Sequence, residues 1–132
     1  MNEEILVRII TPSATALQCR AEIATIPGEY GEFGVLPKHS PIIANLHPGV
    51  MKVSLRNSNF DYFIYGGIAQ VSGTEVNVVT EFAVELDKVK KNEILDKINL
   101  FKEKSATETD PNKIFDLRHA LDIYEALLSF LK

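Results

Sequence analysis

The feature that most constrains the fold of this chain is a change in hydrophobic period near Leu86. Before that residue, short segments alternate apolar and polar side chains, as Ile5, Val7 and Ile9 do in the run ILVRIIT. A period of two is typical of β-strands with one buried face. After Leu86, apolar residues recur every three or four positions, which is the period of an amphipathic helix. The pattern therefore divides the chain into an all-β part and a helical part.

Several short segments of the first part have strand character and are separated by turn residues. Asn57-Ser58-Asn59 and Ser72-Gly73-Thr74 each lie between two such runs and predict hairpin turns. Gly66-Gly67 interrupts an apolar run, where glycine indicates a bulge or a close approach of two backbones. Strands at this spacing without intervening helices predict an antiparallel β-sandwich, a flattened barrel, over residues 1–86. The expected strands are 5–11, 21–26, 50–56, 60–65, 68–71 and 75–80.

Two amphipathic segments follow and predict a helical hairpin over residues 87–132. The first runs through DKVKKNEILDKINLFKEK and is followed by a break at SATETD. Asp110 then supplies an N-cap acceptor, and Pro111 suits the first helical position. Two such helices with a short connection pair antiparallel, which makes the fold class α+β. The apolar seam expected on the second helix is Ile114, Leu117, Leu121, Tyr124, Leu128 and Leu131.

The run IPGEYGEFGVLPKHSPIIANLHPGV, Ile26–Val50, raises the question of a catalytic or phosphate-binding loop. Its glycines have neither dinucleotide nor phosphate-loop spacing, and the prolines that follow leave no helix N-terminus to face a phosphate. His39 and His47, with a glutamate of the run as a third ligand, lack the helical spacing or ligand cluster of a metal site. Glycine and proline together fix one irregular path, so we interpret the run as a rigid docking surface.

Composition argues against several other function classes. The formal net charge of −4 gives no general attraction to nucleic acid, and most of the 14 Lys and Arg residues lie from Lys88 onward, among dense Asp and Glu. Cys19 is the only cysteine, so no intrachain disulfide or multi-cysteine metal site can form. The serines lack a G-x-S-x-G elbow, so no catalytic set is expected. No apolar run reaches the ~20 residues that span a bilayer, and we expect no direct membrane insertion.

Two motifs resemble a known family. The run PGEYGEFGVLPKHSPIIANLHPG, Pro27–Gly49, is similar to the signature of the epsilon subunit of F-type rotary ATP synthases, with its G-x-F/L-G-x-x-P-x-H-x-P core. GGIAQV, Gly66–Val71, resembles a second segment of that family. The family combines a β-sandwich with a C-terminal helical hairpin, so the resemblance covers essentially the whole chain. It implies a non-catalytic central-stalk subunit that rotates with the gamma subunit on the ring of c subunits and couples proton flow to ATP synthesis.

The resemblance also implies contact residues. Glu32 and His39 fall where the family presents its sandwich edge to the polar loops of the c ring. An exposed ion pair at Glu32 would orient the sandwich on the ring and add little affinity, because such pairs contribute only about 0–1 kcal/mol. Apolar contact between the sandwich and gamma would carry more of the affinity.

The hairpin of this family acts as an inhibitor: folded against the sandwich it permits turnover, and extended along gamma it blocks ATP hydrolysis. The resemblance makes residues 87–132 a regulatory segment. In the extended state, the basic residues Lys88, Lys90 and Lys91 would contact acidic surfaces of the alpha and beta catalytic subunits.

Some members bind ATP in the folded hairpin through an Ile/Leu-Asp-x-x-Arg-Ala motif. Here Asp87 is retained, but Lys90 replaces the arginine, and lysine lacks its planar bidentate fork. Arg118 keeps a matching position on the second helix, while Glu125 stands where a second arginine is common. These departures argue against ATP binding.

A second interpretation of the sequence remains open, namely a β-sandwich adaptor whose hairpin recognises a helix in another complex. We expect no signal or transit segment before the first strand pattern. For the rotary-synthase interpretation, we therefore expect a peripheral protein held by its partners at the cytoplasmic face of the bacterial inner membrane.

Overall fold

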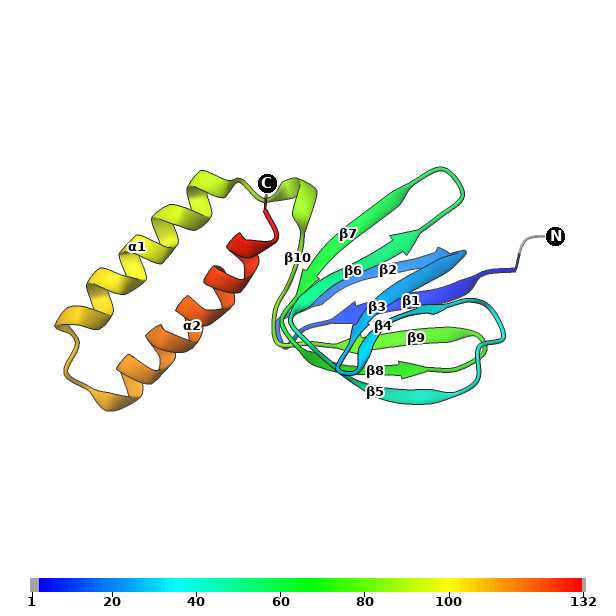
Figure 1. The fold of residues 1–132 in the computed structure, drawn as a ribbon, viewed down its shortest axis with the longest axis horizontal. Helices are drawn as coiled ribbons and strands as arrows, with labels where there is room; N and C mark the ends of the chain where they lie inside the picture. The colour runs from blue at the N-terminus through cyan, green and yellow to red at the C-terminus, as the bar shows by residue number, and fades with distance from the viewer. Residues whose placement is uncertain (1–2, 132) are drawn as a thin grey trace. The chain divides into compact units, whose positions relative to one another are not determined.

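The computed structural model describes residues 3–131 and divides into two compact units, one ending at Asp87 and one beginning at Lys88. The first unit consists of ten strands and the second of two helices (Figure 1). The strands are β1 (Ile5–Ile10), β2 (Thr15–Ala21), β3 (Ile23–Gly28), β4 (Gly31–Val35), β5 (Ile42–Leu46), β6 (Gly49–Ser54), β7 (Asn59–Ile64), β8 (Gly67–Val71), β9 (Glu75–Val79) and β10 (Ala83–Glu85).

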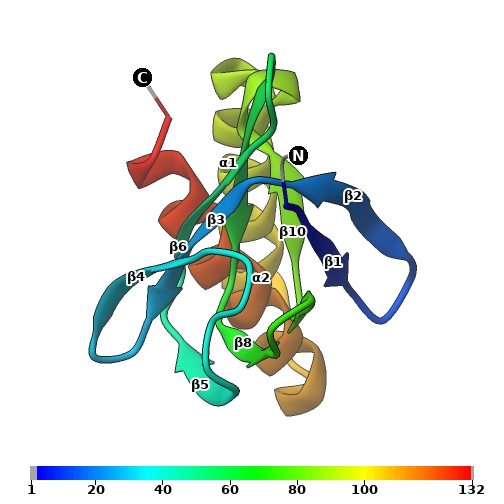
Figure 2. The same ribbon diagram turned by 90° about the vertical axis from the view of Figure 1, so that its right-hand side faces the viewer.

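All ten strands belong to one hydrogen-bonded sheet that folds over on itself into a sandwich (Figure 1, Figure 2). The strand order is β10-β7-β6-β3-β5-β8-β9-β1-β2, and β4 pairs with β3 outside that order. The sheet turns its corner between β3 and β5, which pair only at Gly28 and Leu46. This architecture confirms the predicted β-sandwich. Strands β1 and β9 run parallel, which differs from the expected antiparallel pairing.

Side chains alternate between the inside and the outside of the sandwich along each strand, and the inward ones form the core. Ile5, Val7 and Ile9 of β1 are fully buried, and the residues between them are half-buried, as the period of two predicts. In the register with β2, these three residues lie opposite Ala21, Cys19 and Leu17. Apolar burial of this kind is the main favourable term in folding.

The predicted turns lie where the sequence places them. Ser72 closes the β8–β9 turn, since its N–H donates to the carbonyl of Glu75 at 2.9 Å and its Oγ accepts from the Glu75 N–H at 3.1 Å. Gly66 and Gly67 have φ of +71° and +109°, which L side chains rarely adopt. A Cβ at Gly67 would also overlap the backbone of Val79, so the predicted close approach is confirmed.

The interpretation of Ile26–Val50 as a single irregular run was wrong. It contains the end of β3 and the strands β4 and β5. Glycine is depleted in strand interiors but tolerated in a strand paired on one side only, as β4 is with β3. The expected strand at 21–26 is also interrupted, because Ala21 ends β2 and Glu22 separates it from β3.

The second unit is a helical hairpin, as predicted. Helix α1 spans Lys91–Thr107 and α2 spans Pro111–Ser129, and the two lie side by side and antiparallel (Figure 1). The carboxylate of Asp110 accepts a hydrogen bond from the Asn112 N–H at 2.9 Å, which confirms the predicted N-cap.

The helix boundaries correct two expectations. The residues before α1 are not α-helical: Leu86–Lys88 form a short 3₁₀ helix, η1, and Lys90 is extended. The predicted break at SATETD is shorter, because Ser105 and Thr107 belong to the last turn of α1. Their hydroxyl groups donate to the carbonyls of Lys102 and Lys104, within the last turn.

The buried positions of α2 also differ from the predicted seam. Ile123 and Leu127 are the buried residues, whereas Tyr124 and Leu128 are half-buried. Helix α2 is apolar over a wide arc, so the sequence period does not distinguish two neighbouring stripes.

Candidate functional site

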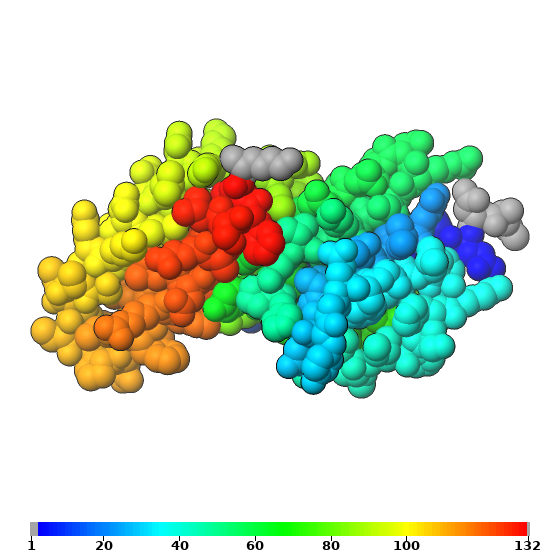
Figure 3. Space-filling model, viewed as in Figure 1, coloured from blue at the N-terminus to red at the C-terminus, as the bar shows by residue number. Residues whose placement is uncertain are grey.

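A groove of about 400 Å³ lies beside the β3–β4 turn, between that hairpin and β5. The turn consists of Glu29 and Tyr30 and is followed by Gly31, whose φ of +129° lets the chain reverse tightly. Tyr30 is 98% exposed, and Ile43 on the other side of the groove is 72% exposed. The segment of β4, the following loop and β5, cyan in Figure 3, occupies much of the sandwich surface on the side shown.

Glu32 lies on β4 opposite Pro27 and is exposed at this groove. Glu29 is the second carboxylate of the groove, and the lining residues include no lysine or arginine. The groove therefore combines a negative potential with exposed apolar side chains. Such a surface suits a partner that carries a basic group beside apolar ones.

His39 lies in the loop between β4 and β5 and is half-buried. Its Nδ1 is 2.7 Å from the Ser40 carbonyl oxygen. The preceding residue, Lys38, has a φ of +69°, and its N–H donates to the carbonyl of Gly73 at 2.8 Å. The loop is thereby held against the β8–β9 turn.

The structure does not bring Glu32 and His39 together. Glu32 lies near the start of β4, and the loop with His39 follows the end of that strand at Val35. Three strand residues span about 10 Å, so the two side chains occupy different ends of β4. They form no acid–base or metal pair and mark two points along one surface.

A row of apolar side chains crosses the outer face of β8, β9 and β1. Ile68 lies opposite Val79 in the β8–β9 pair, and Val79 lies opposite Ile10 in the β9–β1 pair. Ile68 is 45% exposed and Val79 is 52% exposed. Together with Pro12 they line an open depression of about 450 Å³. We call Ile10, Ile68 and Val79 the apolar row.

Neither the apolar row nor Tyr30 was predicted from the sequence. The expected strands 68–71 and 75–80 include Ile68 and Val79 but do not distinguish outer from inner positions. A signal was present at Val78 and Val79, two adjacent apolar residues that reach both faces of the strand. For Tyr30, the signal was an aromatic residue between two glycines, Gly28 and Gly31.

The basic residues Lys88, Lys90 and Lys91 lie together where η1 ends and α1 begins, and all three are exposed. Arg118 is exposed within α2. Antiparallel packing places the start of α1 beside the end of α2, and about 16 Å of helical rise separates Arg118 from that end at Ser129. Lys90 and Arg118 are therefore not brought together. Asp87 is exposed in η1.

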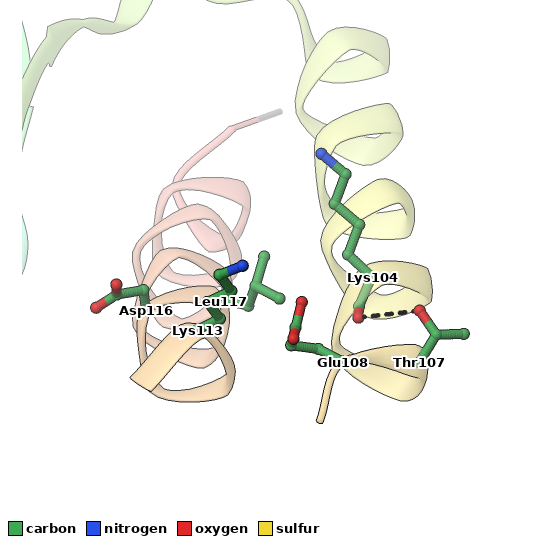
Figure 4. Close-up of a pocket in the computed structure, with 6 residues that line it drawn as sticks. All are labelled: Lys104, Thr107, Glu108, Lys113, Asp116 and Leu117. Carbon is green, nitrogen blue, oxygen red and sulfur yellow. Dashed lines mark hydrogen bonds between the residues drawn. The ribbon is translucent and has the colours of Figure 1, made fainter. Parts of the chain in front are cut away.

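A groove of about 480 Å³ opens between the helices near their connection (Figure 4). Lys104 and Lys113 contribute ammonium groups to its lining. Carboxylates of Glu108 and Asp116 offset them, and Asp116 points away from α1. Glu108 is already engaged, because its Oε1 accepts hydrogen bonds at 3.1 Å from two backbone N–H groups of the connection. The groove has no surplus of positive charge for an anionic ligand.

The structure gives little support for a metal site, a reactive thiol or a membrane-spanning helix. Within residues 3–131, no three His, Cys, Asp or Glu side chains gather closely enough to hold a metal ion. Cys19 is half-buried, and burial raises the pKa of its thiol, which lowers its nucleophilic fraction at neutral pH. Neither helix of the described chain is long and apolar enough to cross a membrane.

Comparison with known proteins gives consistent matches. Residues 4–86 match the family model described as ATP synthase, Delta/Epsilon chain, beta-sandwich domain. The chain is 42% identical over 97 residues to the ATP synthase epsilon chain of Rickettsia typhi, a match that covers 71% of this chain and 88% of that protein. It is 41% identical over 101 residues to the ATP synthase epsilon chain of Rickettsia felis, with coverage of 74% and 90%.

Solved structures agree with these matches. A chain in the cryo-EM structure of the Euglena gracilis mitochondrial ATP synthase, OSCP/F1/c-ring, superimposes with a TM-score of 0.68 and 26% identity, over 96% of this chain and 80% of that one. A chain of the Tetrahymena thermophila mitochondrial ATP synthase central stalk and c-ring gives a TM-score of 0.58 at 13% identity, over 96% and 98%, which supports the fold.

Proposed function

Because the chain belongs to the ATP synthase epsilon-chain family, whose members are non-catalytic subunits of the rotary enzyme, we propose that it couples the rotor to the catalytic head from the central stalk. In this role it transmits the rotation driven by proton flow and catalyses no reaction itself. The observation that carries the proposal is the 41–42% identity to the rickettsial epsilon chains, which extends over 88–90% of their length. The Euglena match, to a complex that includes F1 and the c-ring, supports an assembly of this kind.

In this proposal, the groove beside β4 docks on the polar loops of the c-subunit ring. Its exposed Tyr30 and Ile43 supply apolar contact, and Glu32 supplies a charge that pairs with a basic side chain of the loop. Aromatic side chains that become buried commonly carry most of the energy of an interface, whereas a rim charge fixes its register. His39 contacts the ring at the other end of β4.

A cysteine cross-linking experiment in assembled membranes tests this docking. Glu32→Cys is paired with single cysteines along the polar loop of the c subunit, in a Cys19→Ala background. We expect a disulfide adduct at one or two loop positions. Asn57→Cys is the matched control, because Asn57 is exposed in the β6–β7 turn. If Glu32→Cys gives no more adduct than this control, the groove does not dock on the ring.

The apolar row supports a second contact, with the gamma subunit. Its three side chains lie on neighbouring strands, so they present one continuous apolar strip instead of scattered residues. An exposed strip of this kind, with a depression along it, is characteristic of an interaction surface. The rotor contact through gamma is therefore assigned to the outer face of β8, β9 and β1.

The hairpin has a regulatory role in the proposal. When it extends, the exposed residues Lys88, Lys90 and Lys91 contact acidic surfaces of the alpha and beta subunits and block ATP hydrolysis. Their position at the start of α1 supports this, because they cluster where the second unit begins. Deletion of residues 87–132 is expected to raise the ATPase rate of the assembled enzyme. An unchanged rate would count against the regulatory role and leave the docking role standing.

The proposed location follows from these partners. The chain is held at the cytoplasmic face of the bacterial inner membrane by gamma and the c ring, and it makes no contact with nucleic acid. Fractionation tests this directly: the chain stays with washed membranes and is released when the catalytic head and stalk are stripped.

A further inference from the structure

One side chain of α2, Tyr124, contacts two side chains of α1. Its ring stacks on the ring of Phe101, with centroids 5.7 Å apart and an interplanar angle of 25°. The Nζ of Lys97 lies 5.2 Å from the centroid of the Tyr124 ring. Because Lys97 and Phe101 are four residues apart, they project from the same face of α1 on successive turns. Tyr124 thus contacts two turns of the neighbouring helix at once.

A second contact between the two helices is an exposed ion pair. Lys102 Nζ and Glu125 Oε1 are 4.0 Å apart with both side chains more than half exposed, and such a pair contributes little. Only four residues of the two helices are buried, Ile94, Ile98, Ile123 and Leu127. A hairpin with so little burial opens more readily than the sandwich core unfolds.

We propose that Tyr124 is the latch of the hairpin: its contacts with Lys97 and Phe101 set how often α2 separates from α1. The two contacts differ in kind. Stacking with Phe101 buries apolar surface, and the attraction of the Lys97 ammonium to the ring face needs only the aromatic system. Neither contact requires the phenolic oxygen. The regulatory meaning of the latch rests on the proposed function, because an open hairpin is the inhibitory form.

Hydrogen exchange of the full chain, followed by mass spectrometry, measures the opening directly. Tyr124→Ala is expected to raise the exchange rates of α1 and α2 amides about thirty-fold, which corresponds to about 2 kcal/mol. Sandwich amides serve as the internal reference and keep their rates. The matched control is Phe115→Ala, which removes an aromatic residue of the same helix that is 70% exposed and stacks on His119 of α2 itself.

Two conservative variants distinguish a specific role of the Tyr124 contacts from a general loss of packing between the helices. Tyr124→Phe retains the ring, and with it both contacts, so its hairpin amides are expected to exchange more slowly than those of Tyr124→Ala. Lys97→Met keeps the aliphatic stem but loses the charge, and we expect faster hairpin exchange by about threefold. If Tyr124→Ala prevents the helices from forming at all, Lys97→Met decides the question, because it leaves both rings in place.

The outcomes test the role of Tyr124 in hairpin opening separately from the proposed inhibitory function of the hairpin. If Tyr124→Ala exchanges no faster than Phe115→Ala, or if Lys97→Met matches the natural chain, the latch is refuted, whatever the enzyme does. If the hairpin opens as expected and the assembled enzyme loses ATPase activity, the latch and its regulatory role are both supported. If the hairpin opens while the ATPase rate stays constant, the latch stands and the inhibitory function of the hairpin fails.

Discussion

Gly67 lies directly against Val79 of the neighbouring strand, so that a Cβ atom at Gly67 would overlap the Val79 carbonyl oxygen. The contact brings β8 and β9 together at the edge of the depression along the apolar row. It explains why the first residue of β8 is glycine.

The first prediction concerns this contact. Gly67→Ala should destabilise the sandwich by at least about 3 kcal/mol, because the substitution adds a backbone overlap to an unfavourable positive φ. Gly31→Ala is the control: Gly31 also has a positive φ, of +129°, but nothing lies within 4 Å of its would-be Cβ. The Gly31→Ala variant should lose only about 1–2 kcal/mol of stability. Urea unfolding followed by far-UV circular dichroism measures both, and equal losses would contradict the account.

The second prediction concerns the apolar row. Ile68→Asp should leave the chain folded, because Ile68 is 45% exposed, but weaken its association with gamma about a hundredfold. Gln70→Asp is the matched control on the same strand and face, two residues away. Titration of the purified chain against gamma provides the comparison. A similar affinity for both variants would remove the apolar row from the gamma interface.

The third prediction concerns Cys19, which faces inward from β2 opposite Val7. Burial raises the pKa of its thiol from 9.0, so the folded chain holds this proton more tightly than the unfolded chain. The resulting stabilisation is complete below that value and is lost as the pH rises through the raised pKa. Between about pH 8 and about pH 10.5, the natural chain should therefore lose more stability than Cys19→Ala. Urea unfolding at both pH values measures this difference. If the two chains lose the same stability between these pH values, the prediction is wrong.

The fourth prediction concerns the start of α2. Asp110→Ala removes the acceptor of the Asn112 N–H and should cost the hairpin about 1 kcal/mol. Asp122→Ala, at an exposed position within α2, should have almost no effect. Hydrogen exchange of the first amides of α2 compares the two variants. An equal effect of both would show that the cap does not determine where the helix begins.

The sequence was most informative where a single physical rule acts locally. The alternation of Ile5, Val7 and Ile9 predicts β1, and Asp110-Pro111 predicts the start of α2, because both depend on neighbouring residues alone. The glycine pair at the start of β8 also predicts a close approach, although the residue approached, Val79, lies on the neighbouring strand.

The elements that the sequence did not predict depend on distant partners. Strand β4 is rich in glycine and becomes a strand because β3 pairs with it along its whole length. Strand β10 has three residues and is defined by its pairing with β7. The choice of Ile123 and Leu127 over Tyr124 and Leu128 as buried positions likewise depends on packing that the helical period does not encode.

The candidate site shows the same division. The position of Glu32 on an exposed surface could be expected from its motif, whereas its separation from His39 follows from the length and direction of β4. The apolar row could not be predicted as a surface, because Ile10, Ile68 and Val79 become neighbours only through strand register.

The most direct test of the central claim is co-purification of the full chain with the rotor. A tagged chain, expressed in a bacterium that carries the matching ATP synthase, is recovered from mild-detergent extracts, and its partners are identified by mass spectrometry. If the chain is a central-stalk subunit, gamma and the c ring are recovered with it in constant proportion, and Ile68→Asp reduces both. Recovery of a different complex without gamma and c, as expected for a sandwich adaptor with a helix-binding hairpin, would contradict the account.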